Sequence, residues 1–219
     1  MTTIAADYQA KADKLCQTVD DLMTRENWEV VEDKNGVLIE RMNSSNYDGY
    51  MFKMTFTTDM SMNDFMLVTQ PRVLGGEREK WDTEMKKVSM VEEVTENLKI
   101  IRQETNKFGV GLVSPREFVV MAYKKTIPES NTLVHVMESV EHNECSEKED
   151  IIRATRYPTG MHMSVVDNGG TSSLKVVQLS QVDMGGLIPM SFFTTLLPFM
   201  VVGFPEDLRK YLKIIKGQA

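Results

Sequence analysis

The stretch Gly185–Phe204, GGLIPMSFFTTLLPFMVVGF, contains no charged residue, in a chain of which 26% is charged. Its length is close to that of a helix that crosses a bilayer. Against such a helix, Pro189 and Pro198 remove backbone hydrogen bonds, and a serine and two threonines dilute the apolar run. We therefore expect a helix that is buried on more than one side, by the protein on one side and by a lipid on the other.

The composition limits the class of protein. The 219 residues, 42% of them hydrophobic, suit one domain with a sizeable core. A net charge of -7 repels nucleic acid, so no nucleic-acid partner is expected. Cys16 and Cys145 lack disulfide or zinc spacing, which predicts two unpaired thiols and a reducing compartment. Met1–Lys14 lacks the apolar core of a signal peptide, so we expect a cytoplasmic protein.

Three local patterns predict secondary structure before the apolar stretch. Apolar residues recur every three or four positions over residues 3–25, which predicts an amphipathic helix. Lys34-Asn35-Gly36 between apolar runs predicts a hairpin, because both Asn and Gly tolerate positive φ. Ser61 and Asp64 resemble a capping box, and they predict a short helix that ends at Pro71.

The rest of the chain reads as closely spaced strands. We expect them at residues 28–32, 37–42, 50–57, 87–94, 98–105, 117–125, 132–140, 151–157, 161–166 and 173–183. Glu144–Asp150 is dense in charge and is expected to be a solvated loop. No repeat or linker divides the chain, so we predict one α+β domain over residues 1–219, an antiparallel sheet that encloses space against its last helix.

Several segments together resemble the START family of lipid-transfer domains. Gly75–Asp82 (GGEREKWD) resembles its Arg-x-x-Trp-Asp segment, and Val113–Phe118 (VSPREF) resembles its Ser-Pro-Arg-Asp-Phe segment, with Glu117 in place of Asp. Further matching segments follow in the family's order: Ser139–His142, Ile152–Ala154, Asp183–Pro189 and Leu208–Leu212. The GG-x-R-x-K-W-D motif and the length of the chain are most similar to those of the single-domain soluble subgroup that transfers sterols or bile-acid-like steroids.

The resemblance implies a helix-grip fold and a carrier rather than an enzyme. In that fold a curved sheet of about nine strands surrounds an apolar tunnel, which the C-terminal helix and a loop close. Residues 106–114 would form that loop, and Gly185-Gly186 the turn into the lid helix. Glycines there permit the backbone changes that a gate needs.

Candidate ligand-binding residues come first from the apolar stretch. Steps back from Leu208 by turns of a helix place one set of residues on one face: Met190, Phe193, Leu197, Met200 and Phe204. We expect this face to cover the ligand; the alternative is that it only packs on the sheet.

Further candidates lie on the predicted strands. The chain has 17 methionines, and Met161 and Met163 suit an adaptable apolar cavity, although ordinary core filling explains any single one equally well. Several family members carry a buried acid–arginine pair, and the corresponding positions here, counted from Arg116, are Gln103 and Ala122. The tunnel should therefore be less polar than in those members, with Phe118 as a further candidate. Gln103 is expected either to meet a ligand hydroxyl or keto group or to face solvent from its strand. A carotenoid or fatty-acyl lipid becomes an alternative to cholesterol.

The enzymatic and sensory alternatives rest on few residues. None of the three histidines has metal-ligand spacing and no Gly-x-Ser-x-Gly elbow is present, so no metal, cofactor or catalytic residue is expected. A cyclase of the helix-grip type would need an acid–base residue in the tunnel, for which His135 and Glu138 are the candidates. A ligand-dependent sensor that acts through a protein partner is the third class.

The sequence thus predicts a monomeric cytoplasmic carrier of one sterol, bile-acid-like steroid or carotenoid. Transient contact with a membrane is expected during exchange. The basic residues Arg209, Lys210, Lys213 and Lys216 either meet anionic headgroups or only complement the helix dipole.

Overall fold

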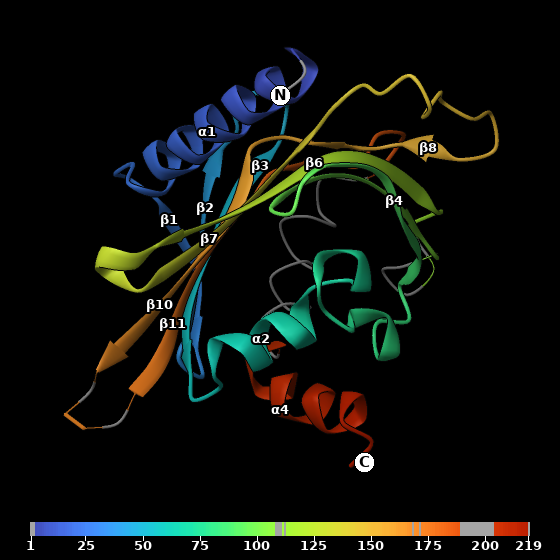
Figure 1. The fold of residues 1–219 in the computed structure, drawn as a ribbon. Coiled ribbons are helices and arrows are strands. Elements are labelled where there is room, and N and C mark those ends of the chain that lie inside the picture. Colours follow the sequence, from blue (N-terminus) through green and yellow to red (C-terminus); the bar gives the residue numbers. More distant parts are fainter. Residues whose placement is uncertain are drawn as a thin grey trace.

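The computed structural model describes residues 3–107, 111, 113–167, 169–170, 172–188 and 204–218. Figure 1 shows three layers: helix α1 (Thr3–Met23) on one face of a curved antiparallel sheet, the sheet itself, and helices α2 (Met62–Thr69) and α4 (Phe204–Ile215) on the opposite face. The start of α1 and the end of α4 therefore lie on opposite sides of the sheet (Figure 1). This arrangement is the predicted α+β helix grip.

Within the described residues, nine strands form one continuous path in the order β1-β2-β3-β11-β10-β7-β6-β5-β4, with antiparallel neighbours throughout. Their bounds are β1 Glu29–Lys34, β2 Val37–Asn43, β3 Tyr50–Thr58, β4 Met85–Thr95, β5 Leu98–Thr105, β6 Arg116–Ile127, β7 Thr132–Ser139, β10 Thr159–Asp167 and β11 Ser172–Ser180. Strand β8 (Ile152–Arg153) pairs in parallel with β6, and β9 (Thr155–Arg156) pairs with β12 (Val182–Asp183). Short 3-10 turns occupy Arg72–Leu74, Arg78–Lys80 and Pro128–Ser130.

The local signals in the sequence are confirmed where they concern turns and caps. Asn35 and Gly36 have φ values of 56° and 76° and join β1 to β2. Ser61 caps α2, and its Oγ accepts a hydrogen bond from the backbone N–H of Asp64 at 3.1 Å. These elements form where predicted because a few neighbouring residues dictate them.

The alternation of side chains along each strand separates two cores. In β7, Val134 and Val136 contact the core under α1, whereas His135 and Met137 point to the opposite face. The α1 core includes Ala12, Leu15, Val19, Leu22, Met51, Ile100, Val119, Met121 and Leu179. The core under α2 and α4 includes Ile39, Phe56, Phe65, Val68, Met163, Val176 and Leu208.

Two predicted strands are interrupted. The single strand expected at 151–157 is two short strands, because the N–H of Ala154 between them donates to the carbonyl of Glu117 and β9 then turns to β12. The strand expected at 173–183 breaks at Gln181, whose buried side chain accepts hydrogen bonds from Ser44 and Asn46 and donates one to the carbonyl of Pro158. Tertiary hydrogen bonds therefore override the strand pattern at both places.

The described helices include none that is both long and apolar enough to cross a membrane. Of the apolar stretch that opened the sequence analysis, residues 189–203 lie outside the described residues. Gly185 and Gly186 have positive φ values of 61° and 71°, as expected for the turn that leads into it.

Candidate functional site

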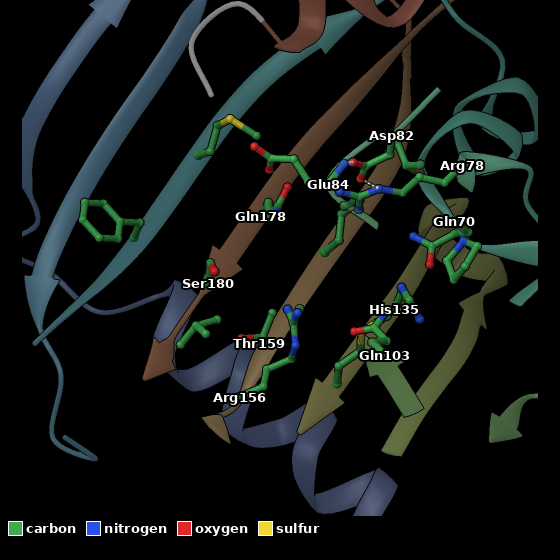
Figure 2. A pocket seen from close by; sticks show the side chains of 18 of the residues that line it. Gln70, Arg78, Asp82, Glu84, Gln103, His135, Arg156, Thr159, Gln178 and Ser180 are labelled. Atoms are coloured by element: carbon green, nitrogen blue, oxygen red, sulfur yellow. Dashed lines mark hydrogen bonds and ion pairs between the residues drawn. The ribbon is translucent and has the colours of Figure 1, made fainter. Parts of the chain in front are cut away.

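A cavity of about 640 Å³ lies between the concave face of the sheet and the elements that cover it. The sheet contributes side chains from several neighbouring strands: Phe52, Met54, Gln103, His135, Met137, Thr159, Met161, Gln178 and Ser180. The opposite wall includes the end of α2, Arg78, residues 81–84 and Tyr211 of α4. Figure 2 shows that polar side chains from both walls enter this space.

Two of the candidate ligand-binding residues line this cavity. Gln103 on β5 and Met161 on β10 both do so. They belong to the strand positions that face away from α1, so the alternation that buries their neighbours against the helix turns them inward. Met190, Phe193, Leu197 and Met200 lie outside the described residues, as does the side chain of Phe204.

Three other candidates face the same way but do not line the cavity. Met163 is fully buried in the core under α4, and Ala122 faces only a small void of about 20 Å³ beside Leu74 and Met66. Phe118 lies beneath Arg156, with the guanidinium carbon 5.3 Å from its ring centroid. Sequence reasoning chose Ala122 by its position relative to a family motif and Met163 by its residue type, and neither criterion shows how far the covering elements extend over the sheet.

The cavity also contains polar groups that sequence reasoning missed or left open. His135 is the cavity-facing member of the pair considered for acid–base chemistry. Burial lowers the pKa of His135 to about 4, with smaller contributions from the charges of Arg156 and Lys124. Glu138 instead faces α1, where burial raises its pKa although Lys14 and Lys11 oppose the shift. The imidazole of His135 is therefore neutral near pH 7.

Arg156 was not expected in the cavity, and it brings a charged group into a lining in which Gln103 is neutral. Burial lowers the pKa of Arg156 to about 10, with a further contribution from the like charge of Arg78. Its Nε atom is buried without a hydrogen-bond partner among the described residues. The sequence contains no signal for this residue, because β9 is only two residues long and alternation along it cannot show which way Arg156 points.

The segment between α2 and β4 builds the wall opposite the sheet. The Nε of Arg78 donates to Asp82 Oδ2 at 2.7 Å, and the indole N–H of Trp81 donates to the carbonyl of Val68 at 2.9 Å. Trp81 stacks on Tyr211 of α4, with ring centroids 3.9 Å apart and planes 9° apart. This segment thereby ties α2 to α4 over the cavity.

A model of the START domain matches residues 11–213 of this chain. The chain belongs to the START family. The resemblance drawn from its motifs is thereby confirmed, as is the helix-grip fold.

Individual relatives of this START chain cover nearly its whole length. StAR-related lipid transfer protein 5 of Bos taurus is 25% identical over 217 residues, 99% of either chain. StAR-related lipid transfer protein 4 of Homo sapiens is 26% identical over 187 residues, 85% of this chain and 87% of the relative. The solved structure of human StAR-related lipid transfer protein 5 has a TM-score of 0.83 at 21% identity and covers 97% of this chain and 98% of its own. Human STARD10 has a TM-score of 0.69 at 17% identity, over 91% and 78%.

The Ser-Pro-Arg segment of this START domain holds the turn that leads into the apolar stretch. Arg116 is 2% exposed, and its guanidinium donates to the carbonyls of Met184, Gly185 and Ser114. Burial lowers the pKa of Arg116, but the three carbonyls satisfy its donors. These contacts give the arginine a structural role.

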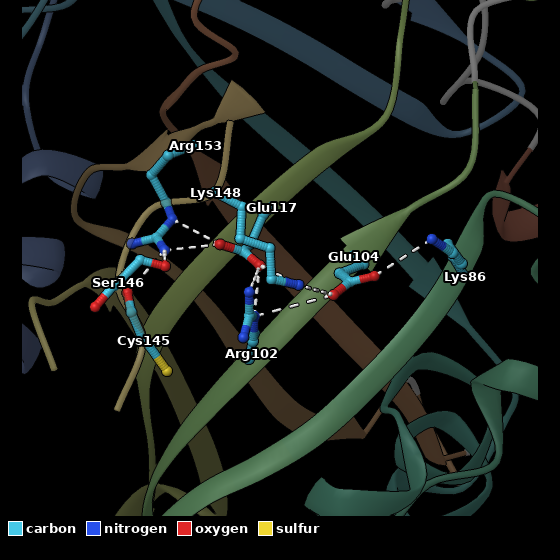
Figure 3. A network of polar contacts seen from close by, with 8 residues as sticks. All are labelled: Lys86, Arg102, Glu104, Glu117, Cys145, Ser146, Lys148 and Arg153. Carbon is cyan, nitrogen blue, oxygen red and sulfur yellow. Dashed lines mark hydrogen bonds and ion pairs between the residues drawn. The ribbon is translucent and has the colours of Figure 1, made fainter. Parts of the chain in front are cut away.

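Glu117, the residue that departs from the family pattern, lies at the centre of a network of charged side chains. This network is on the face of the sheet opposite to the cavity. Figure 3 shows Glu117 between Arg102, with which it pairs, and Arg153, whose Nη2 lies 2.7 Å from Glu117 Oε1. Arg153 also donates to the carbonyls of Cys145 and Ser146. Part of the charged stretch 144–150 is therefore tied to the sheet rather than free in solvent.

Proposed function

We propose that this START protein is an intracellular lipid carrier, a single domain over residues 1–219 that holds one apolar ligand in the cavity described above. The cavity carries the proposal: its volume of about 640 Å³ falls within the range of about 300–1,000 Å³ that is usual for small-molecule sites. Apolar contacts from Phe52, Met54, Met137 and Met161 provide burial. Each methylene moved into such a site gains about 0.8 kcal/mol.

The proposal that the chain transfers its ligand between membranes is supported by its relatives. The matching proteins are called lipid transfer proteins, so we propose that this chain likewise takes its ligand from one membrane and releases it at another. The ligand class follows the sequence prediction: a sterol, a bile-acid-like steroid or a carotenoid. We propose a cytoplasmic monomer that contacts membranes transiently.

Two of the four basic residues in and just after α4 suit that membrane contact. Arg209 pairs with Asp59 and Lys216 with Asp64, so these two already have partners. Lys210 and Lys213 are exposed on the same helix. We propose that these two lysines meet anionic headgroups during exchange.

The test combines identification of the bound ligand with a matched pair of variants. Native mass spectrometry before and after solvent extraction is expected to release one lipid per protein. Ser180→Trp fills the cavity from β11, and Lys175→Trp places the same side chain on the other face of that strand. We expect Ser180→Trp to reduce vesicle-to-vesicle transfer of a fluorescent sterol at least about tenfold and Lys175→Trp to retain it.

Equal transfer by both variants would refute the cavity as the binding site. A protein that stays empty, and that takes up no sterol, steroid acid, carotenoid or acyl lipid when these are offered, would refute the carrier. Release of a chemically altered ligand would favour the cyclase-type enzyme, and a change in affinity for a protein partner upon loading would favour the sensor.

A further inference from the structure

The guanidinium of Arg156 stands in the cavity wall without a counter-charge. Its backbone N–H donates to Ser139 Oγ at 2.8 Å, which fixes the residue beside the end of β7, and its side chain stacks over Phe118. Figure 2 shows Arg156 along the same wall as Thr159 and Gln103, neither of which carries a charge. Nothing in this wall neutralises the arginine.

The charged groups around Arg156 are already engaged or have the wrong sign. Arg78, also in the cavity, is a like charge, and the nearby Asp82 pairs with Arg78 itself. Glu84, the other carboxylate of the lining, does not contribute to the pKa shift of Arg156. His135 is neutral near pH 7. Among the described residues no carboxylate forms an ion pair with Arg156, and its buried Nε has no acceptor.

An unpaired charge inside a protein is costly, and native structures retain one mainly where something else binds it. Arg116 offers an internal comparison, because it is also buried, but its guanidinium donates to the carbonyls of Met184 and Gly185 in the turn that it holds and to that of Ser114. Arg156 holds no such turn with its side chain. Its donors are directed at the space that the ligand would occupy.

We propose that the ligand of this cavity is an acidic amphipath, an apolar body that carries one anionic group, and that Arg156 binds that group. This inference rests on the proposed carrier function and narrows its ligand class. A guanidinium presents a planar fork of donors that matches the oxygens of a carboxylate, sulfate or phosphate. Neutral sterols and carotenoids would then be poorer ligands than their acidic counterparts.

The test uses ligands that differ only in charge. A steroid carboxylate and its methyl ester have nearly the same apolar body, so calorimetric titration of the full chain with both isolates the contribution of the anion. We expect the wild-type protein to bind the carboxylate about 10 to 100 times more tightly than the ester, because a hydrogen-bonded charge replaces a desolvated one. Sulfate and phosphate esters of the same steroid show which anion fits.

Three variants test whether Arg156 causes the preference for the carboxylate over the ester. Arg156→Met keeps much of the side chain's volume and should reduce the preference to within about twofold, mainly by weakening carboxylate binding. Arg156→Lys keeps the charge and should retain part of it. Arg25→Met removes an exposed arginine after α1, far from the cavity, and should leave both affinities unchanged.

The outcomes separate this inference from the carrier function. Equal wild-type affinities for carboxylate and ester would show that water satisfies Arg156, and would overturn the inference while leaving the carrier intact. A preference that persists in Arg156→Met would also overturn it, because another group would then bind the anion. Binding of no steroid, acyl lipid or carotenoid at all would instead refute the carrier function.

Discussion

The same strands form a packed core on one face of the sheet and a cavity on the other. Toward α1, side chains from the helix and the strands fill the space. Asp20 Oδ1 on the helix lies 3.0 Å from His162 Nε2 on the sheet. Toward α2 and α4, the strands leave a cavity of about 640 Å³, in which Arg156 has no counter-charge. The filled face stabilises the fold, and the hollow face presents the Nε of Arg156 and the side-chain oxygen of Gln70 to the space that a ligand would occupy.

Strand β7 shows the division within a single element. Val134 and Val136 are almost wholly buried against α1, whereas His135 and Met137 line the cavity. Neighbouring residues therefore contribute to different properties. Substitutions that separate stability from ligand affinity test this division.

The largest effect is expected from the filled face. Leu15→Ala removes a side chain that is 3% exposed and should lower the free energy of unfolding by about 3 to 4 kcal/mol, because the close-packed surroundings cannot collapse fully. Met161→Ala removes a side chain of the cavity wall and should cost about 1 kcal/mol, since part of its surface already faces open space. Urea denaturation of ligand-free protein measures both. Similar losses for the two variants would contradict the division.

The next effect concerns pH and His135. The pKa of this histidine is about 4 in the folded protein and about 6.5 when unfolded, so between these values only the unfolded state takes up the proton. Stability should therefore fall as the pH is lowered from 6.5 to 4, by about 2 to 3 kcal/mol from this group. His135→Gln should flatten that part of the pH profile of the unfolding free energy. An unchanged slope would mean that His135 is hydrated rather than desolvated in the cavity.

A smaller change of the opposite sign is expected at Arg156. Arg156→Met should raise the stability of the ligand-free protein by about 1 kcal/mol, because an unpaired charge is replaced by an apolar side chain of similar length. Urea denaturation measures the change, and Arg25→Met serves as the exposed control. A clear loss of stability would show that Arg156 supports the fold.

The smallest effect is expected at Gln70, at the end of α2. Its side-chain oxygen is buried in the cavity wall with no hydrogen-bond partner among the described residues, so it can accept a hydrogen bond from a ligand hydroxyl. Gln70→Met should weaken binding of a hydroxylated steroid acid about threefold and leave its deoxy analogue unaffected. Parallel titration of both ligands is the measurement. Equal weakening of both would indicate a change of cavity shape instead.

The parts of the fold that could be predicted depend on few residues. The hairpin at Asn35-Gly36 and the cap at Ser61 are decided within four residues, and α1 by its apolar spacing. The break between β8 and β9 could not be predicted, because it depends on a hydrogen bond from Ala154 to Glu117, a residue 37 positions earlier. Such long-range partners leave no local pattern.

The candidate site was only partly predictable for a related reason. The position of Gln103 relative to a family motif and the high methionine content that suggested Met161 pointed to two residues that line the cavity. His135 stayed open because β7 is apolar on both faces, so alternation does not tell which face meets the cavity. Arg156 was missed because the sequence around it shows neither alternation nor a motif that includes it.

The chain has two tryptophans, and one lies on each side of the sheet. Trp28 packs with the core under α1, and Lys53 lies over its ring, whereas Trp81 lines the cavity and stacks on Tyr211. The protein therefore contains its own pair of fluorophores: emission from Trp81 should respond to cargo, and emission from Trp28 to unfolding. With Trp28→Phe or Trp81→Phe, loading and unfolding become separate optical signals from an unlabelled chain.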